Sequence, residues 1–242
     1  MAASSKPEKW LDGCIQAHRR LEQHVANLTD ELARRDSVLP GWTVGHVLTH
    51  LARNADGHTG MAQAAQAGQI GFQYPGGQEQ RERDIANLHS RPAAELVSDL
   101  RDALRRLEDA WAELSNDAWA TALRRRVPGG PITSLAESVF SRWRETEVHF
   151  ADLGLAELAI SGWDGLSPAY VEAEWPEITG GLGRRVPDGF SLMLVPGDRP
   201  SRVYGRGEQL VHIRATPPRI LQWLLGRGGV ASWPELAPWG TA

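Results

Sequence analysis

The sequence contains a single cysteine and no long apolar segment. With Cys14 alone, no disulfide can form within the chain, which fits a reducing compartment. Cys14 falls in a helical apolar pattern, where a free cysteine usually behaves as a small buried hydrophobe, so we do not expect it to be a nucleophile. No apolar run reaches the roughly 20 residues that cross a bilayer, and the segment Met1–Trp10 lacks an apolar signal core. We therefore expect a cytoplasmic protein with no membrane partner.

An excess of charge of one sign is also absent. The chain has 26 basic and 30 acidic residues, a formal net charge of −4, and its basic residues are scattered rather than clustered. This balance argues against a nucleic-acid partner. A hydrophobic fraction of 41% and a charged fraction of 23% are ordinary for a globular protein. The 242 residues suffice for one large domain or two small ones.

Apolar residues at helical spacing fill the first two-thirds of the chain. They predict four amphipathic helices, whose apolar stripes run over 11–28, 44–55, 96–114 and 135–153. Thr43 is a good N-cap for the second helix, and Ser134 with Glu137 matches a capping box for the fourth. The segment 68–77, rich in Gly and Gln, is typical of a loop. Four such helices most simply form a four-helix bundle, which we assign to residues 1–154.

The composition changes after Gly154: Gly, Pro and Trp become frequent, and the helical spacing of apolar residues weakens. Residues 190–195 and 210–214 predict two strands. Pro217 and Pro218 then open a short helix that Gly226 closes. We assign residues 155–242 to a smaller α+β domain, so the predicted fold class is mainly α.

Three potential metal ligands stand out within the helical region. Glu145 and His149 are four residues apart, so their side chains project from the same face of a helix. His50 lies on an earlier predicted helix, at the edge of its apolar stripe. Two histidines and a carboxylate, with one position left open, are a common way to hold a catalytic divalent metal. Metal sites in helical bundles are built from such inward side chains on facing helices.

The same residues have a simpler interpretation. A histidine at the edge of an apolar face is often a hydrogen-bonded core residue, and a Glu-x-x-x-His pair is often an electrostatic pair on a helix. Spacing alone therefore leaves both interpretations open. Burial of two histidines and a carboxylate together favours the metal, because burying such groups without compensation is costly.

Several neighbours of these ligands have open roles. We expect His46 to support the site or lie on the surface, and His58 to be solvated or to line the mouth of a pocket. Asp152 fits either an exposed residue or a carboxylate that orients a ligand imidazole. We expect Arg142 to be solvated, although it could meet an anionic substrate. Arg227 lies between glycines, and from the residues alone we favour a solvated side chain after a helix C-cap.

Two segments resemble a known family. The sequence LPGWTVGHVLTHL at 39–51 resembles the second-helix signature of the DinB-like superfamily of metal-binding four-helix bundles. The sequence RETEVHFADLG at 144–154 resembles the fourth-helix signature of one branch, the mycothiol-dependent maleylpyruvate isomerases. The likeness extends to Tyr74-Pro75, to Arg81 and Ile85 in what we predict to be the middle loop, and to the turn 226–228. It covers nearly the whole chain in order.

This resemblance implies a DinB-like bundle with a zinc ion held by His50, Glu145 and His149, with water completing the coordination. It implies that Arg227 matches an arginine important for activity, and we expect Arg227, Arg81 and Asn54 to contact the substrate. It also implies that mycothiol, a low-molecular-weight thiol, is the cosubstrate.

The implied reaction is the cis-trans isomerisation of maleylpyruvate to fumarylpyruvate. Zinc lowers the pKa of a thiol, the thiolate adds to the activated double bond, the resulting single bond rotates, and elimination returns the thiol. A thiol S-transferase acting on another electrophile is the alternative, and a non-catalytic metal-binding regulatory domain is a third. The sequence leaves open the metal, the electrophile, the preferred thiol, and whether the protein is a monomer or a weak homodimer.

Overall fold

The computed structural model describes residues 6–121, 123–125, 129–130 and 132–238. The chain forms two compact units, residues 1–162 and residues 163–242. The boundary expected after Gly154 falls just before this division. Residues 1–5, the start of the segment expected to lack a signal core, lie outside the described residues.

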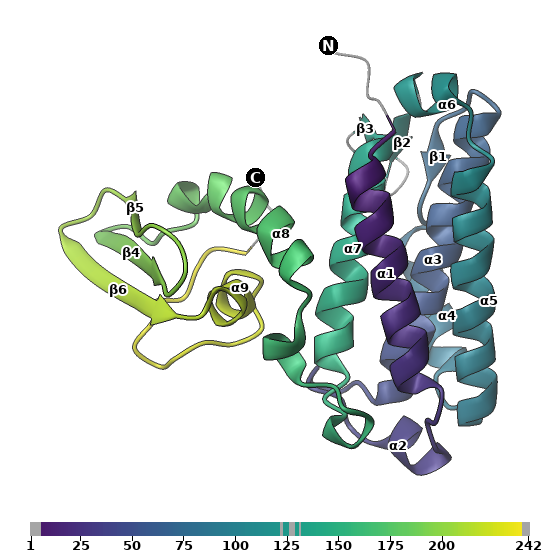
Figure 1. Cartoon of the computed structure of the whole chain (residues 1–242), viewed down its shortest axis with the longest axis horizontal. Coiled ribbons are helices and arrows are strands. Elements are labelled where there is room, and N and C mark those ends of the chain that lie inside the picture. Colours follow the sequence, from purple (N-terminus) through teal and green to yellow (C-terminus); the bar gives the residue numbers. More distant parts are fainter. Residues whose placement is uncertain (1–5, 122, 126–128, 131, 239–242) are drawn as a thin grey trace. The chain divides into compact units, whose positions relative to one another are not determined.

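Four long helices build the first unit (Figure 1). They are α1 (Glu8–Val25), α3 (Val44–Gln66), α5 (Ala93–Ala112) and α7 (Leu135–Asp152). Helix α3 packs against α5 and α7, and α1 packs against the same two helices. Each helix turns its apolar stripe inward, and the fully buried leucines include Leu21, Leu48, Leu51, Leu96, Leu100, Leu104, Leu107 and Leu135. The predicted four-helix bundle is thereby confirmed.

Capping boxes fix where the two ligand-bearing helices begin. At α7, the Glu137 backbone N–H donates to Ser134 Oγ at 3.3 Å, and the Ser134 N–H donates to Glu137 Oε2 at 2.8 Å. At α3, Thr43 is the N-cap, and its N–H donates to His46 Nδ1 at 3.1 Å. A histidine thus replaces the usual acidic partner of the box. Both predicted caps are confirmed, and His46 serves to hold the start of α3.

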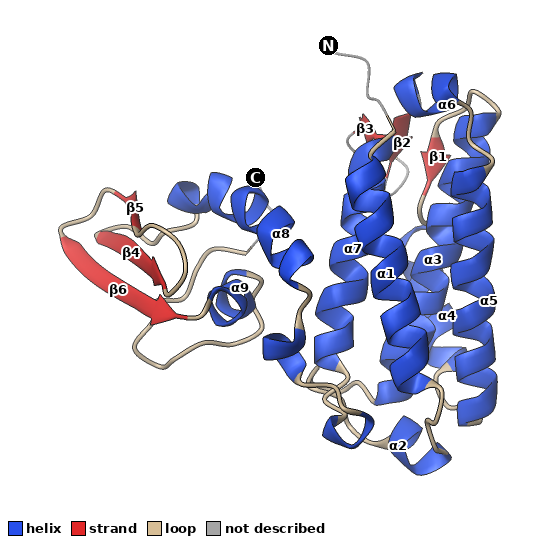
Figure 2. Ribbon diagram, viewed as in Figure 1, coloured by secondary structure: helices blue, strands red, loops and turns tan. Residues whose placement is uncertain are grey.

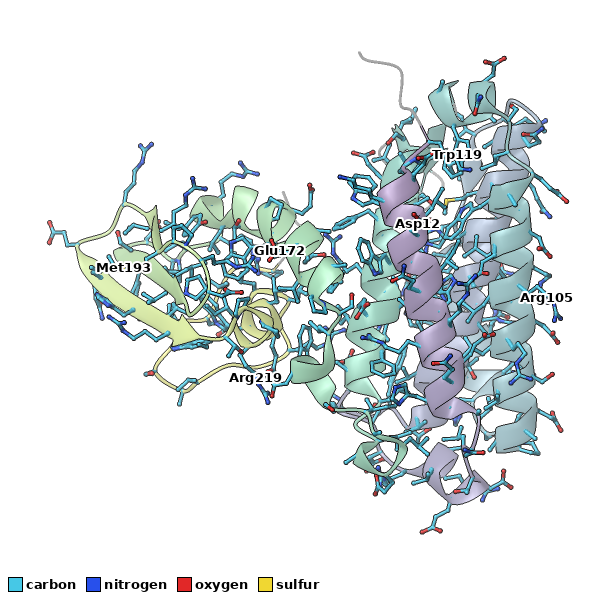
Figure 3. The ribbon with its side chains drawn as sticks, in the orientation of Figure 1. Asp12, Arg105, Trp119, Glu172, Met193 and Arg219 are labelled. Carbon is cyan, nitrogen blue, oxygen red and sulfur yellow. The ribbon has the colours of Figure 1, made fainter. Side chains whose placement is uncertain are left out.

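Shorter elements complete the first unit. They are α2 (Asp30–Arg34), α4 (Gly77–Leu88), α6 (Asn116–Thr121), η1 (Ala156–Leu158), and the strands β1 (Gly71–Phe72), β2 (Leu123–Arg125) and β3 (Ile132–Ser134), which form a sheet in that order. The middle loop expected around Arg81 and Ile85 is wrong, because both residues lie on α4. Ile85 is the one buried residue of that helix, so α4 shows no apolar stripe. Trp119 of α6 is buried, whereas Arg105 of α5 points outward (Figure 3).

The second unit is a small sheet with helices (Figure 2). Its elements are η2 (Gly162–Gly165, which starts at the division), α8 (Pro168–Gly180), η3 (Leu182–Arg184), β4 (Phe190–Pro196), β5 (Arg202–Gly205), β6 (Gln209–Ala215) and α9 (Pro217–Leu224). Strand β4 lies between β5 and β6, antiparallel to the first and parallel to the second. Leu192, Leu194 and Ile213 of this sheet are buried. The predicted α+β character and two predicted strands are confirmed, and α8 and β5 are additional. No helix in the described part of the chain is long and apolar enough to span a membrane.

Candidate metal centre

Three side chains from two facing helices meet inside the bundle. His50 comes from α3, and Glu145 and His149 come from α7. One ligand atom from each lies within 4.8 Å of the other two. His50 Nε2 is 2.9 Å and His149 Nε2 is 3.3 Å from the same oxygen, Glu145 Oε2. The two imidazole rings are edge to face, with centroids 4.7 Å apart. The convergence predicted from sequence is therefore present in the structure.

Burial and mutual contact set the charges of this cluster. Burial is the main reason that the pKa of His50 falls to about 4. Burial alone would raise the pKa of Glu145, but hydrogen bonds with His149 and His50 outweigh it and hold that pKa well below its usual range. Burial would lower the pKa of His149, but the close carboxylates of Asp152 and Glu145 raise it instead. At neutral pH the cluster thus offers a carboxylate and a neutral His50 imidazole.

Asp152 lies against His149. Its carboxylate is fully buried, and Oδ2 lies 3.0 Å from His149 Nδ1, an ion-pair distance without an aligned hydrogen bond. A carboxylate at this position favours a hydrogen on Nδ1, which leaves Nε2 to face the cluster. Asp152 is therefore not the exposed residue that the sequence allowed, and its orienting role stays a prediction.

Arg81 approaches the cluster from α4. Its Nη2 donates to His50 Nδ1 at 3.1 Å. Its guanidinium carbon lies 5.9 Å from the ring centres of both Trp42 and Tyr74. The predicted substrate residue Arg81 thus lies beside the ligand His50 and near two aromatic rings.

Asn54 lies one helical turn after His50 and is also buried. Its Oδ1 accepts a hydrogen bond from Arg142 Nη1 at 2.7 Å, and its Nδ2 donates to the Tyr74 hydroxyl at 3.4 Å. Both ends of the Asn54 amide are therefore hydrogen-bonded to protein side chains, and the contact of Asn54 with substrate stays a prediction.

Two expectations about neighbouring residues are wrong. Arg142 is fully buried rather than solvated, because its guanidinium donates to Leu51 O at 3.0 Å as well as to Asn54. His58 is fully buried rather than at a pocket mouth, and its Nδ1 lies 2.9 Å from Ser138 Oγ of α7. In both cases the partner belongs to another helix and leaves no local sequence signal.

Cys14 is buried as expected. Burial is the main cause that raises the pKa of its thiol above the usual range. The one cysteine of the chain is therefore not a reactive thiolate near neutral pH.

Arg227 belongs to the second unit, in the turn after α9. The flanking Gly226 and Gly228 have φ of 73° and 95°, values that favour glycine. The Arg227 N–H donates to Gln222 O at 2.9 Å, and its carbonyl accepts from Gln222 Nε2 at 3.0 Å. Arg227 lines a cavity of about 670 Å³ together with Trp223. Its predicted role in activity stays a prediction.

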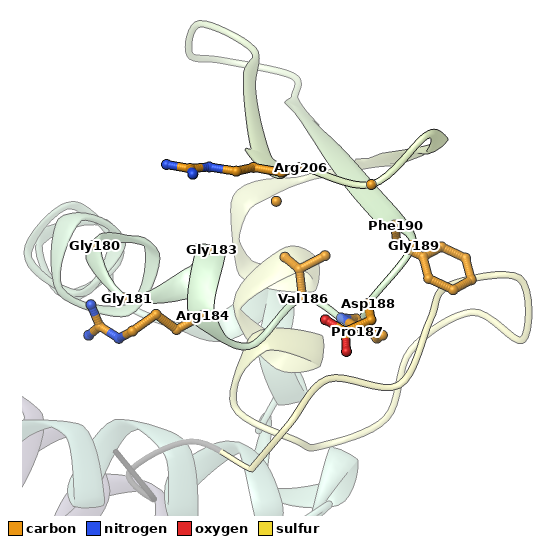
Figure 4. Close-up of a pocket in the computed structure, with 12 residues that line it drawn as sticks. Gly180, Gly181, Gly183, Arg184, Val186, Pro187, Asp188, Gly189, Phe190 and Arg206 are labelled. Carbon is orange, nitrogen blue, oxygen red and sulfur yellow. The ribbon is translucent and has the colours of Figure 1, made fainter.

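A second cavity of the same unit, about 550 Å³, lies beside Arg184 and Arg206 (Figure 4). Among the described residues, Asp188 is the one carboxylate in its lining, and no histidine or cysteine lines it. The candidate metal site is therefore the cluster in the first unit, where three potential ligands converge, rather than this cavity.

The donor set fits a divalent metal. The two imidazoles and one carboxylate converge, and the buried Asp152 carboxylate lies 3.0 Å from one imidazole. With three protein ligands a tetrahedral ion keeps an open position, as catalytic sites do. Such a mixed set accepts several first-row metals, so the donors alone do not choose among them.

Comparisons with known proteins agree with this fold. A family model described as the mycothiol maleylpyruvate isomerase N-terminal domain matches residues 14–154, more than half of the chain. Two crystal structures, of a mycothiol-dependent maleylpyruvate isomerase and of a histidine-to-alanine variant of it, each match with a TM-score of 0.82 at 23% sequence identity. Each match covers 97% of this chain and 97% of the other. No curated protein shows significant sequence similarity. At 23% identity the structures establish the fold, and together with the family match they confirm the resemblance inferred from the sequence.

Proposed function

Since the chain belongs to the mycothiol maleylpyruvate isomerase family through residues 14–154, we propose that it is a metal- and thiol-dependent isomerase. The proposed reaction converts maleylpyruvate to fumarylpyruvate with mycothiol as the thiol. The observation that carries the proposal is the convergence of His50, Glu145 and His149, with a buried carboxylate behind His149 and an arginine beside His50.

The cluster is suited to prepare an external thiol. A divalent ion held there, which we propose to be zinc, supplies positive charge that lowers the pKa of a neighbouring thiol. The chain needs a thiol from outside, because its own Cys14 is buried and its thiol pKa is raised. Glu145 stays ionised as a ligand because its pKa lies well below the usual range.

Arg81 is the residue best placed to bind a substrate carboxylate. When His50 ligates through Nε2, its ring hydrogen must sit on Nδ1. Nδ1 can then no longer accept the hydrogen bond that Arg81 donates in the structure. The Arg81 guanidinium is thereby freed for another acceptor, and a carboxylate is its preferred partner. Asn54 and Arg227 are further proposed contacts.

The remaining steps of the isomerisation take place on the substrate and the thiol. Addition of the thiol sulfur turns the cis double bond into a single bond, rotation follows, and elimination restores the thiol with a trans double bond. The proposed partners are therefore small molecules, and we propose that the protein acts in the cytoplasm as a monomer or weak homodimer.

The test is a conversion assay with purified, metal-loaded protein. We expect maleylpyruvate to become fumarylpyruvate with mycothiol, more slowly or not at all with glutathione, and not after removal of the metal by a chelator. Restoring the metal should restore the rate. If maleylpyruvate is unchanged while mycothiol becomes alkylated by another electrophile, the protein is an S-transferase. If no thiol reaction occurs with metal bound, a regulatory role replaces both.

A further inference from the structure

A series of hydrogen-bonded side chains lies one helical turn from the metal cluster and ends on the hydroxyl of Tyr74. Tyr74 follows β1 and is 7% exposed. Its hydroxyl oxygen lies 3.4 Å from Asn54 Nδ2 and 3.5 Å from Gln73 Nε2. Both neighbours are amide nitrogens, which donate hydrogen bonds and cannot accept them.

The direction of this series is set at its buried end. A guanidinium can only donate, and Arg142 Nη1 lies 2.7 Å from one atom of the Asn54 amide, which must therefore be the oxygen. The nitrogen of that amide then faces Tyr74. On the other side, Gln73 Nε2 also lies 3.3 Å from His58 Nε2, which accepts from it when the His58 ring hydrogen is on Nδ1, toward Ser138 Oγ. In this tautomer of His58 the Tyr74 oxygen accepts from both amides, and its own hydrogen has no acceptor among the described residues.

Tyr74 is located beside the cluster by two independent contacts. The guanidinium of Arg81, which bonds His50, lies over the Tyr74 ring at 5.9 Å. Asn54, which bonds the Tyr74 hydroxyl, lies one turn along α3 from His50. Tyr74 is therefore a neighbour of the cluster, with a hydroxyl hydrogen to donate.

Arg142 adds a positive charge to this series of hydrogen-bonded side chains. It is fully buried, forms no ion pair among the described residues, and its buried Nη2 has no hydrogen-bond partner. A buried cation without a counter-ion is costly, and it suits a site that receives anions. In a low-dielectric interior this charge polarises the groups hydrogen-bonded in series with it, which strengthens the Tyr74 O–H as a donor.

We propose that Tyr74 is a catalytic hydrogen-bond donor to the carbonyl oxygen of the substrate, and that Asn54 and Arg142 are its positioning residues. This inference rests on the isomerase function proposed above. As the sulfur electron pair forms the C–S bond, the electrons of the conjugated double bond move onto the carbonyl oxygen. Tyr74 keeps its proton and donates a hydrogen bond to that oxygen. On elimination the electrons return, the C–S bond breaks, and the double bond forms again.

The test compares the wild type with Tyr74→Phe, which removes the hydroxyl and keeps the ring. We expect kcat to fall about 10²-fold, as for loss of one donor to a developing oxyanion, with the KM for the thiol and the metal content unchanged. Tyr170→Phe is the matched control, because Tyr170 is a fully buried tyrosine whose hydroxyl donates to Glu174 at 3.0 Å in the second unit. We expect this control to keep the wild-type kcat.

A double-mutant cycle tests the positioning residue. Arg142→Met should lower kcat in the wild-type background and have little further effect in Tyr74→Phe, because Arg142 acts through that hydroxyl. Arg142→Lys should restore part of the loss by keeping the charge. A merely structural role would give additive losses and no rescue.

The outcomes separate the two proposals. If the wild type isomerises maleylpyruvate and Tyr74→Phe has the same kcat, the role of Tyr74 is overturned and the isomerase function stands. An equal loss in Tyr170→Phe also overturns it, because the effect would then be general. A wild type without thiol-dependent isomerisation overturns both.

Discussion

Asp152 is the residue that we expect to orient His149. Its buried carboxylate lies 3.0 Å from Nδ1 and favours the tautomer whose Nε2 faces the cluster. It also helps to raise the pKa of His149, whereas burial lowers that of His50 to about 4. The two histidine ligands therefore differ in protonation, and each difference has a measurable consequence.

Asp152→Asn should weaken metal binding about 10- to 100-fold, as loss of a carboxylate behind a ligand imidazole usually does. Titration of the metal-free protein with Zn²⁺ against a competing chelator measures this change. Glu157→Gln, which removes an exposed carboxylate paired with Arg35, is the control and should bind like the wild type. Equal affinities for all three proteins would contradict the orienting role.

Metal binding should also depend on pH through His149. Its pKa is raised, so near and below that pKa a proton competes with the metal for the imidazole. The affinity should fall by about tenfold per pH unit below it and level off above it. His50 contributes no such dependence above about pH 5, because its pKa is about 4. In Asp152→Asn the pH at which affinity begins to fall should move lower. The same chelator competition, repeated from pH 5.5 to 8.5, decides this, and a flat profile would refute it.

Close packing between helices places Arg81. A Cβ on Gly45 of α3 would lie 2.2 Å from the backbone oxygen of His89, the C-cap of α4. Glycine is therefore required at this contact, and it lets α4 approach α3 near His50. Gly60 of the same helix has open space around the equivalent position.

Gly45→Ala should lower the free energy of unfolding by about 1–3 kcal/mol, because backbone must move to admit the methyl group. Gly60→Ala should raise it by about 0.5–1 kcal/mol, because alanine is the better helix former. Urea unfolding monitored by circular dichroism measures both. The same sign for both variants would show that the α3–α4 contact is looser than described.

The helices that have a capping residue or an apolar stripe in the sequence could be predicted from it. The caps at Thr43 and Ser134 and the inward stripes follow from chemistry within a few residues. Helix α4 was missed because Ile85 alone is buried in it, and the strands of the first unit have only two or three residues.

The site residues, like the helices, were predictable only where their signal is local in the sequence. The i,i+4 pair Glu145 and His149 is visible in the sequence, whereas the burial of Arg142 depends on acceptors on α3 and α1. Tyr74 carries a sequence signal only through the Tyr-Pro likeness, and its donor role depends on Asn54 and Gln73 together.

The stability of the protein as a whole should depend on buried neutral histidines. His18 is 1% exposed, lies 2.8 Å from Glu108, and has a pKa lowered to about 4, chiefly by burial. An unfolded histidine has a pKa near 6.5. The neutral, buried His18 therefore makes its full contribution to the free energy of unfolding above about pH 6.5, and this contribution is lost as the pH falls toward 4. His149, with a raised pKa, contributes in the opposite sense.

Between pH 7 and pH 5, the free energy of unfolding of the metal-free wild type should fall by about 2 kcal/mol more than that of His18→Gln. The comparison within one pair of proteins cancels the contribution of His149 and other groups. Urea unfolding at both pH values measures it. Parallel losses in the two proteins would mean that His18 titrates normally in the folded state.

One measurement bears on the metal, the ligands and the proposed chemistry together: the metal content per chain of the wild type, His50→Ala and His149→Ala, by elemental analysis after purification. We expect about one equivalent of a divalent metal in the wild type and in the Glu157→Gln control. Both ligand variants should lose it while keeping their helical circular dichroism. Stoichiometric metal in both folded ligand variants would contradict the site built from His50, Glu145 and His149.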